Sequence, residues 1–264
     1  MKILKTLTAA ALAFAIGSAA FAIDGTQIMT KVYDRQKPDF TQAAVLLNLV
    51  DKNGKVTESR KVGEYGRCKN NLSDIVMIFF SPASVKDTRF LLKENEGDKD
   101  DDKWIFLPSL RTTRRIAASD GEKPFVGTDF TYDDMSSREV ADDTHELLKE
   151  SEDKGNFKDL YVVKSTPKDP KSSQYMYRIS WITKDSWIPT YVELYDKKGK
   201  LLKVNEIKTI TPKTGNRTYN IPSENVMTNV QTGHSTVLKM MNIEVDKPLN
   251  EKYFTPNFLN TGRL

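Results

Sequence analysis

The sequence has a single cysteine and two histidines in 264 residues. Cys68 therefore cannot form a disulfide within the chain, and the stability of the fold has to come from packing. The segment Thr144–Lys149 begins like the helical zinc motif, but it has Lys149 where that motif needs a second histidine. His145 and His234 are isolated from each other in the sequence. We therefore interpret His145 as a surface residue and predict no metal site.

Signatures of catalysis and of nucleotide binding are also missing. No Gly-x-Ser-x-Gly motif is present, and Gly121 and Gly127 do not form a phosphate-binding loop. The acidic segment Gly97–Lys103 resembles a calcium loop, but Lys103 and Ser109 occupy the positions that need glycine and glutamate. We expect no catalytic residues and no cofactor. A hydrolase in which folding pairs the cysteine with a histidine remains an alternative.

The chain has neither a strong excess of one charge nor a second long apolar run. Its formal net charge is +4 with both signs interspersed, so we expect no nucleic-acid partner. The one long apolar run, Leu7–Phe21, follows two lysines and ends in a small-x-small cleavage pattern. It is short for a membrane span. We interpret residues 1–22 as a signal peptide cleaved after Ala22, and the remaining chain as exported and not membrane-spanning.

Patterns typical of β-strands dominate the rest of the chain. Alternating apolar and polar residues predict roughly ten strands joined by short polar turns. Asp51–Gly54 and Asp196–Gly199 have the composition of hairpin turns. This pattern favours an antiparallel meander in one domain, residues 23–264. The predicted strands are Ala43–Val50, Val56–Tyr65, Ile75–Phe80, Thr88–Lys93, Lys103–Leu107, Leu110–Ile116, Leu160–Lys164, Tyr175–Thr183, Trp187–Tyr195, Leu201–Ile210 and Thr236–Val245.

Helices are predicted to be few and short. Asp24 can cap a helix that ends before Pro38 and has Ile28 and Val32 on its apolar face. Pro248 can start another short turn near the C-terminus. Short amphipathic helices of this kind are suited to lying across a sheet.

Two predicted strands are apolar on both faces. Ile75–Phe80 and Trp104–Leu107 have no polar side, although an antiparallel sheet usually exposes one face to solvent. Helices could cover a central strand, or the sheet could curve around an apolar cavity, as small ligand-binding barrels do. The sequence leaves both alternatives open.

Three arginines follow the second of these strands. Arg111, Arg114 and Arg115 could be the ion-paired solvent face of an edge strand. They could instead flank the mouth of a cavity and bind anionic head groups or an acidic partner. Alternation places Arg111 and Arg115 on one face and Arg114 on the other, so at most two of them can serve one site.

Four segments have a distinctive sequence: DDKWIFLPSLRTTRRI (Asp101–Ile116), GTDFTYDD (Gly127–Asp134), DGTQIM (Asp24–Met29) and SWIPTYVELYDKKGK (Ser186–Lys200). Together they resemble the bacterial outer-membrane lipoprotein-sorting protein family of LolA-like fold, over essentially the whole chain after residue 22. The resemblance implies a mainly β fold with a few short helices. That fold is an incomplete, unclosed antiparallel β-barrel, LolA/LolB-like, with a helical lid over an apolar cavity.

The function that the resemblance implies is that of a periplasmic carrier. Such a carrier binds acyl chains of lipids or lipoproteins in its cavity and helps to move them toward the outer membrane. The chain is more similar to a branch associated with resistance-nodulation-division (RND) type exporters, which implies an inner-membrane exporter and an outer-membrane acceptor as partners. The alternative is a non-enzymatic periplasmic accessory subunit of such an exporter or of an outer-membrane complex.

The residues that would carry this function are chosen on physical grounds. Large apolar side chains should line the cavity and its lid, and cationic side chains should contact a head group or a partner protein. The lining candidates are Trp104, Phe106, Tyr177, Ile179 and Trp181 on strands and Ile28 and Val32 on the lid helix; the contact candidates are Arg111, Arg114 and Arg115.

Overall fold

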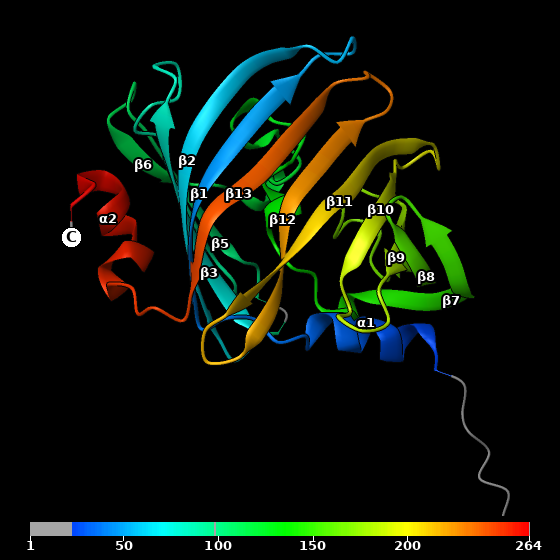
Figure 1. Cartoon of the computed structure of the whole chain (residues 1–264). Helices are drawn as coiled ribbons and strands as arrows, with labels where there is room; N and C mark the ends of the chain where they lie inside the picture. Colours follow the sequence, from blue (N-terminus) through cyan, green and yellow to red (C-terminus); the bar gives the residue numbers. More distant parts are fainter. Residues whose placement is uncertain (1–22, 98, 264) are drawn as a thin grey trace, which may run out of the picture.

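A computed structural model describes residues 23–97 and 99–263 of the chain. The predicted signal peptide and its cleavage site lie outside the described residues. Thirteen strands form one antiparallel sheet (Figure 1), which confirms the mainly β fold. The strands are β1 (Phe40–Val50), β2 (Val56–Lys69), β3 (Leu72–Ser81), β4 (Arg89–Lys93), β5 (Asp102–Leu107), β6 (Thr112–Arg115), β7 (Asp143–Lys154), β8 (Phe157–Pro167), β9 (Tyr177–Ile182), β10 (Pro189–Tyr195), β11 (Leu201–Thr214), β12 (Thr218–Asn229) and β13 (Ser235–Val245).

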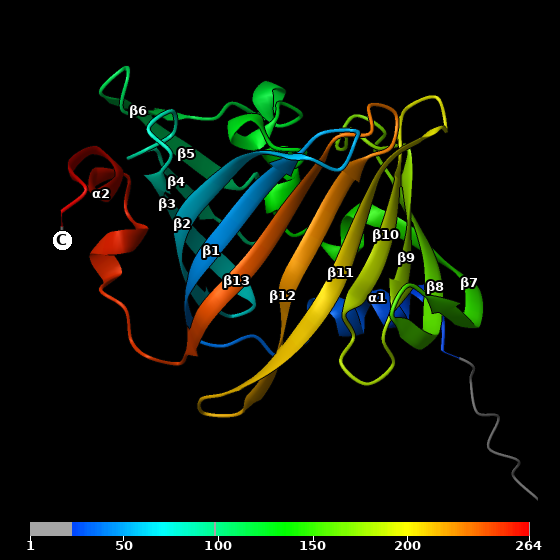
Figure 2. The ribbon, with the colours of Figure 1, turned by 45° about the horizontal axis from the view of Figure 1, so that its top comes forward.

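The path of the chain through the sheet shows which strands form its two edges. The strand order is β6-β5-β4-β3-β2-β1-β13-β12-β11-β10-β9-β8-β7, so the chain starts in the middle of the sheet and runs outward to β6. It then crosses to the opposite edge at β7 and returns strand by strand until β13 pairs with β1. Within the part of the chain that the structure describes, β6 and β7 are therefore the two edge strands of the sheet. Figure 2 shows the strongly curved sheet with the crossing segment on its concave side.

Hairpin turns fix the register of several strand pairs. The Asp51 carboxylate accepts hydrogen bonds from the backbone N–H groups of Asn53 and Lys55, both at 2.9 Å. Asp196 does the same for Lys198 and Lys200 at the β10–β11 turn, also at 2.9 Å. Each turn ends in a glycine with a positive φ, 78° at Gly54 and 73° at Gly199, a conformation that favours glycine. Both predicted hairpin turns are confirmed.

Few helices accompany the sheet. The helix α1 (Gly25–Tyr33) starts at Asp24, whose side chain accepts a hydrogen bond from the Gln27 N–H at 2.8 Å in a capping box. It packs against β7 and β8 at one end of the sheet. The C-terminal α2 (Pro256–Thr261) packs against β4, β5 and β6. Short 3-10 turns complete the structure: η1 (Ala118–Asp120), η2 (Phe125–Gly127), η3 (Asp133–Met135), η4 (Val140–Asp142) and η5 (Glu251–Phe254).

The strands that are apolar on both faces contribute to two separate cores. On β3, Met77 belongs to the core on the concave face, whereas Val76 belongs to an outer core beneath η5 and α2. On β5, Ile105 lies in the concave core and its neighbour Trp104 packs against the outer one. The sequence left open whether helices cover these strands or the sheet curves around an apolar interior. Both occur, because helical turns cover the outer face and an apolar interior lies against the inner face.

Candidate functional site

An apolar cavity of about 190 Å³ lies against the concave face of the sheet. Its other wall comes from the segment that crosses between the two sheet edges, and we call residues 117–137 of that segment the inner loop. The cavity exists because short 3-10 turns of the inner loop hold large side chains over the sheet without filling all the space beneath them. The apolar lining consists of Val45, Leu47, Val62, Ile75, Met77 and Leu238 from strands and Phe125, Phe130 and Met135 from the inner loop.

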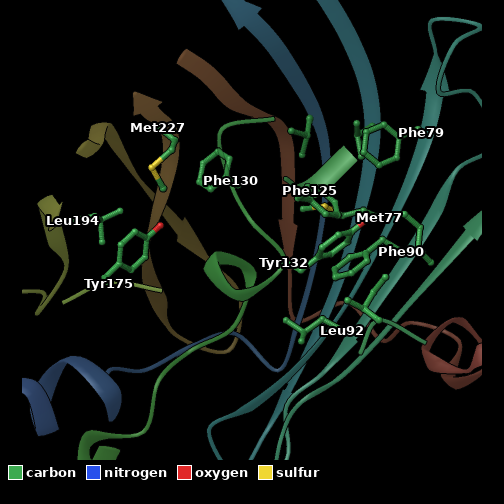
Figure 3. Close-up of a cluster of buried hydrophobic side chains, with 14 residues drawn as sticks. Met77, Phe79, Phe90, Leu92, Phe125, Phe130, Tyr132, Tyr175, Leu194 and Met227 are labelled. Atoms are coloured by element: carbon green, nitrogen blue, oxygen red, sulfur yellow. The ribbon is translucent and has the colours of Figure 1, made fainter. Parts of the chain in front are cut away.

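Aromatic contacts pack part of the inner loop firmly on β4. The rings of Phe125 and Phe90 meet edge to face with centroids 4.9 Å apart, and Phe125 meets Tyr132 in the same way at 5.7 Å. Figure 3 shows these three rings grouped together, whereas Phe130 lies between them and a second group that includes Tyr175 and Met227. Phe130 thus separates the packed part of the interior from the part toward β10 and β12.

A larger cleft of about 1080 Å³ opens beside the cavity. Phe130, Asp134 and Asn225 line both, so the two spaces adjoin. The lining of the cleft is rich in charged side chains of both signs, and α1 contributes Tyr33, whose hydroxyl donates a hydrogen bond to Glu139 at 2.9 Å. An apolar cavity next to a polar cleft is an arrangement that matches an amphiphilic molecule.

Polar contacts tie the inner loop to the sheet. The Arg60 guanidinium on β2 donates a hydrogen bond to the Val126 carbonyl at 2.6 Å. The Thr236 hydroxyl on β13 donates one to the Asp129 carboxylate at 2.7 Å, and the His234 ring contacts the same carboxylate oxygen at 2.8 Å. These contacts hold the inner loop against β2 and β13.

A buried ion pair fixes the end of the inner loop at the boundary between cavity and cleft. The Asp134 carboxylate lies 3.2 Å from the Lys203 ammonium, with both side chains under a tenth exposed. Tyr175 donates its hydroxyl hydrogen to Asp134 at 2.8 Å. Burial, followed by the charge of Asp134, raises the pKa of Tyr175 well above its usual range. Tyr175 therefore stays neutral and keeps this hydrogen bond.

A second buried carboxylate orders the far wall of the cleft. Asp143, at the start of β7, pairs with Arg178 on β9 and with Arg138 at 2.9 Å. Burial lowers the pKa of Arg178, and the charge of Asp143 opposes that effect. Arg138 also donates a hydrogen bond to the Ser172 carbonyl at 2.8 Å. The two arginines are thus held in fixed positions around one carboxylate.

Glu64 is the unusual residue of the cavity wall. It lies on β2 among apolar neighbours, and within residues 23–97 and 99–263 its carboxyl group has no hydrogen-bond or ion-pair partner. Burial raises the pKa of Glu64 to about 7. Asn225 of β12, three strands away from β2 in the sheet, has a buried side-chain oxygen without a partner in the described structure.

The structure places two predicted lining residues, Trp104 and Phe106, in the outer core. Both pack against the cluster that contains Leu259 of α2. Phe106 also lies beneath the Arg89 guanidinium, 4.6 Å from its ring centroid. Neither lines the cavity of about 190 Å³, since on β5 it is Ile105 that points inward.

The three candidates on β9 also lie on the outer face. Arg178 and Ser180 face inward, so Tyr177, Ile179 and Trp181 alternate to the opposite side. Tyr177 stacks on Tyr195 of β10 with centroids 4.4 Å apart. Trp181 and Ile179 pack against Leu160 and Val162 of β8. The lid candidates Ile28 and Val32 pack against Val163 and Ile182 at the β7 end of the sheet. A ligand contact at any of these residues stays a prediction.

The three arginines are exposed at one edge of the sheet. Arg111 lies in the β5–β6 turn with a positive φ of 49°, so the alternation of β6 does not extend to it. Arg114 lies opposite Ile105, and Arg115 lies opposite Trp104. Arg115 pairs with Asp102 and lines the cleft. The structure thus brings only Arg115 of the three to the candidate site, and its head-group role stays a prediction.

The residues considered for catalysis are not gathered at this site. His145 is half-buried, contrary to the expectation of a surface position, and its ring contacts the Ser165 hydroxyl at 2.8 Å and the Val140 carbonyl at 3.0 Å. His234 is also half-buried and contacts the inner loop. No hydrogen bond joins Cys68 to either histidine in the described part of the chain. That part also holds no group of three or more acidic, histidine or cysteine side chains placed for a metal ion.

The sequence reasoning missed the residues that do line the cavity. A signal for the inner-loop wall was present in the aromatic segment GTDFTYDD, which holds Phe130 and Asp134. The sequence showed that β3 and β5 are apolar, but it did not show which of their residues face the inside of the sheet and which face the outside. Glu64 stands as an isolated charge at an inward position between Val62 and Gly66 of β2.

A curved, unclosed antiparallel sheet around an apolar cavity defines the LolA-like class of fold. A crystal structure from Vibrio parahaemolyticus, described as an outer membrane lipoprotein-sorting protein domain, matches with a TM-score of 0.80 and 30% identity over 89% of this chain and 98% of that one. A DUF1329 family protein from Desulfovibrio piger matches with a TM-score of 0.81 and 24% identity over 89% and 97% of the two chains. A LolA superfamily protein from Nitrosomonas europaea matches with a TM-score of 0.64 and 20% identity over 90% and 100%.

The chain belongs to the outer-membrane lipoprotein-sorting protein family of LolA-like fold. A family model with the description "Uncharacterized protein" also matches residues 71–261. None of the curated proteins matches the sequence. Neither helix among the described residues has the length and apolarity needed to cross a membrane.

Proposed function

We propose that this protein is a periplasmic carrier of amphiphilic lipids or lipoproteins. In this proposal the acyl chain enters the apolar cavity, and the polar part of the cargo lies in the adjoining cleft. The observation that carries the proposal is the adjacency of the two spaces, which share Phe130, Asp134 and Asn225. The predicted signal peptide and the family of the chain support an envelope location.

The driving force would be the transfer of the acyl chain out of water. Each buried methylene contributes about 0.8 kcal/mol, so a chain of about 14 carbons would supply roughly 10 kcal/mol before ordering costs. No covalent step is needed. The cargo would be held by burial and released when the cavity opens toward an acceptor.

The size of the cavity implies that the inner loop moves. The cavity of about 190 Å³ is smaller than the roughly 300–1,000 Å³ of typical ligand pockets. Phe130 lines both the cavity and the cleft, and its withdrawal would join the two spaces. The inner loop, rather than α1, would thus act as the lid.

Lipid extraction tests this proposal. The protein would be purified from its native periplasm without detergent, extracted with organic solvent, and analysed by mass spectrometry. We expect about one acyl chain or more per protein, and loss of that lipid when Leu238→Phe fills the cavity. Protein that carries no lipid, with the same result after incubation with lipid vesicles, would contradict the proposal.

A second candidate function is that of an accessory subunit of an RND-type exporter or of an outer-membrane complex. The β5–β6 turn favours it, since Leu110 is 62% exposed there beside Arg111. An exposed leucine next to a cation on a sheet edge is suited to contact with another protein. In this case the purified protein would hold no lipid, and Leu110→Ser would impair the exporter without changing the fold.

A further inference from the structure

One end of the sheet carries a strong excess of positive charge. Because neighbouring strands are antiparallel throughout, the turns between consecutive strands alternate between the two ends of the sheet. Figure 2 shows the β1–β2, β10–β11 and β12–β13 turns together along the top of the molecule. Six turns lie at this end, and we call them the basic rim: residues 51–55, 82–88, 108–111, 168–176, 196–200 and 230–234.

The charges of the basic rim are opposite to those of the other end. The rim turns hold nine lysine and arginine residues against four aspartates, Asp51, Asp87, Asp169 and Asp196. In the turns of the other end, the described residues hold three basic side chains (Lys99, Lys184 and Arg217) against five acidic ones (Glu94, Glu96, Asp100, Asp101 and Asp185). The positive charge is thus concentrated at one end of a chain whose formal net charge is only +4.

The cations of the rim are exposed and are not neutralised by carboxylates. Within residues 23–97 and 99–263, none of them forms an ion pair. Asp51, Asp169 and Asp196 instead accept hydrogen bonds from backbone N–H groups of their own turns. The nine exposed cations are Lys52, Lys55, Lys86, Arg111, Lys168, Lys171, Lys197, Lys198 and Lys200.

Contacts between neighbouring turns join part of the rim into one surface. Lys197 of the β10–β11 turn donates hydrogen bonds to the Pro170 and Ser173 carbonyls of the β8–β9 turn. Gln231 of the β12–β13 turn donates one to the Asp196 carboxylate of the β10–β11 turn at 3.1 Å. These three turns therefore present their lysines side by side.

Exposed apolar side chains are concentrated at the same end. Seven large apolar side chains are exposed among the described residues. Five of them lie in a rim turn or within two residues of one, with at most one to a turn: Val56, Phe80, Leu110, Met176 and Val230. Scattered apolar side chains among unpaired cations are typical of a surface that lies at the boundary between lipid head groups and acyl chains.

From this arrangement we propose that the basic rim docks the protein on a bilayer that contains anionic phospholipids. The cations contact the head groups, and the exposed apolar side chains enter the boundary region. Eight of the nine cations are lysines, a residue that is depleted in protein–protein interfaces. Each lysine near an anionic bilayer strengthens binding by about fivefold. The inference goes beyond the proposed function, because the rim lies outside the apolar cavity.

Sedimentation with lipid vesicles tests this docking. The purified protein would be mixed with vesicles of phosphatidylcholine alone, or of phosphatidylcholine with phosphatidylglycerol, over a range of salt concentrations. We expect binding to the vesicles that contain phosphatidylglycerol and little to the others. The affinity should fall as the salt concentration rises, because salt screens the charges of exposed side chains.

Two sets of substitutions locate the binding surface. The first removes four exposed lysines of the rim: Lys52→Gln, Lys55→Gln, Lys198→Gln and Lys200→Gln. The matched control removes four exposed lysines at or near the opposite end: Lys69→Gln, Lys99→Gln, Lys158→Gln and Lys247→Gln. We expect the rim variant to bind at least about a hundredfold more weakly, whereas the control should lose less than about fivefold.

The failure of this proposal is distinguishable from that of the carrier proposal. Leu238→Phe fills the cavity and should leave vesicle binding unchanged, which separates docking from the uptake of cargo. Equal losses in the rim variant and its control would show that net charge alone drives binding, and would overturn the docking proposal. Absence of binding at low salt would also overturn it and would favour an acidic protein as the partner of the rim.

Discussion

At the residue scale, Glu64 is the side chain whose placement is hardest to explain by stability alone. Its carboxyl group faces an apolar cavity without a partner in the described structure, and burial raises its pKa to about 7. A leucine or methionine would fit the same wall without this electrostatic penalty. Retaining an ionisable group at such a position is typical of a binding function.

The raised pKa gives a prediction for stability against pH. In the unfolded chain Glu64 ionises near pH 4.5, whereas in the folded protein it does so near 7. Folding stability from this group is thus complete below pH 4.5 and falls as the pH rises through 7. Between pH 5 and 8 we expect the free energy of unfolding to drop by about 2 kcal/mol more in wild type than in Glu64→Gln.

Urea denaturation at several pH values measures this difference directly. The glutamine variant is the control because it cannot ionise, and all other titrating groups, including the Asp134–Lys203 pair, are common to both proteins. Parallel stability curves for the two proteins would show that Glu64 is as well solvated when folded as when unfolded.

A second prediction at this scale concerns the space beside Leu238. The change Leu238→Phe adds volume into the existing cavity, so the stability should change by less than about 1.5 kcal/mol. Binding of an apolar fluorescent probe should fall at least about tenfold, since the probe loses its space. Val237→Phe is the matched control, because Val237 is adjacent on β13 and points to the opposite face. Equal probe binding in the two variants would place the probe elsewhere.

At the element scale, the sequence predicted the elements that are held by hydrogen bonds between residues close together in the chain. The hairpin turns and the α1 cap were predicted because their hydrogen bonds form between residues at most four positions apart. The strand β7 was missed because its sequence, DTHELLKESEDK, is largely charged and forms a sheet edge. Its strand character comes from pairing with β8, which no local pattern reveals.

The faces of β5 and β9 could not be predicted from alternation. Trp104 and Ile105 are both apolar, and a register that differs by one residue exchanges the two faces of a strand. The large aromatic residues of β5 and β9 lie on the outer face, where α2 and neighbouring strands cover them. The inner loop was equally hidden, because the Asp129–Thr236 contact joins residues 107 positions apart.

The inner loop is predicted to open when its contacts to the sheet are removed. The Thr236 hydroxyl donates a hydrogen bond to the Asp129 carboxylate and accepts one from the Asp129 backbone N–H. Thr236→Val removes both, which should cost at least about 1 kcal/mol. Hydrogen exchange within residues 117–137 should then become about fivefold faster, and uptake of an apolar probe should accelerate. Thr218→Val, at the exposed β11–β12 turn, is the control. Unchanged exchange in the Thr236 variant would mean that the other contacts of the loop, such as the Arg60 hydrogen bond to Val126 and the Asp134–Lys203 pair, hold it closed without this hydroxyl.

At the scale of the whole molecule, the topology itself creates the site. The sheet begins at its centre with β1, and its two edges are joined by one crossing segment on the concave side. That segment contacts both halves of the sheet, and its inner loop lines both the cavity and the cleft. Movement of a single loop can thereby change access to the entire interior.

The central claim is that an acyl chain lies between the concave face and the inner loop. A photoactivatable fatty acid with a diazirine in its tail, bound to the protein and illuminated, tests this claim most directly. Mass spectrometry should locate the cross-links on inward residues such as Met77, Phe130 and Leu238, with few in the Leu238→Phe variant. Cross-links confined to the outer face, around Trp104 and Phe106, would contradict the account.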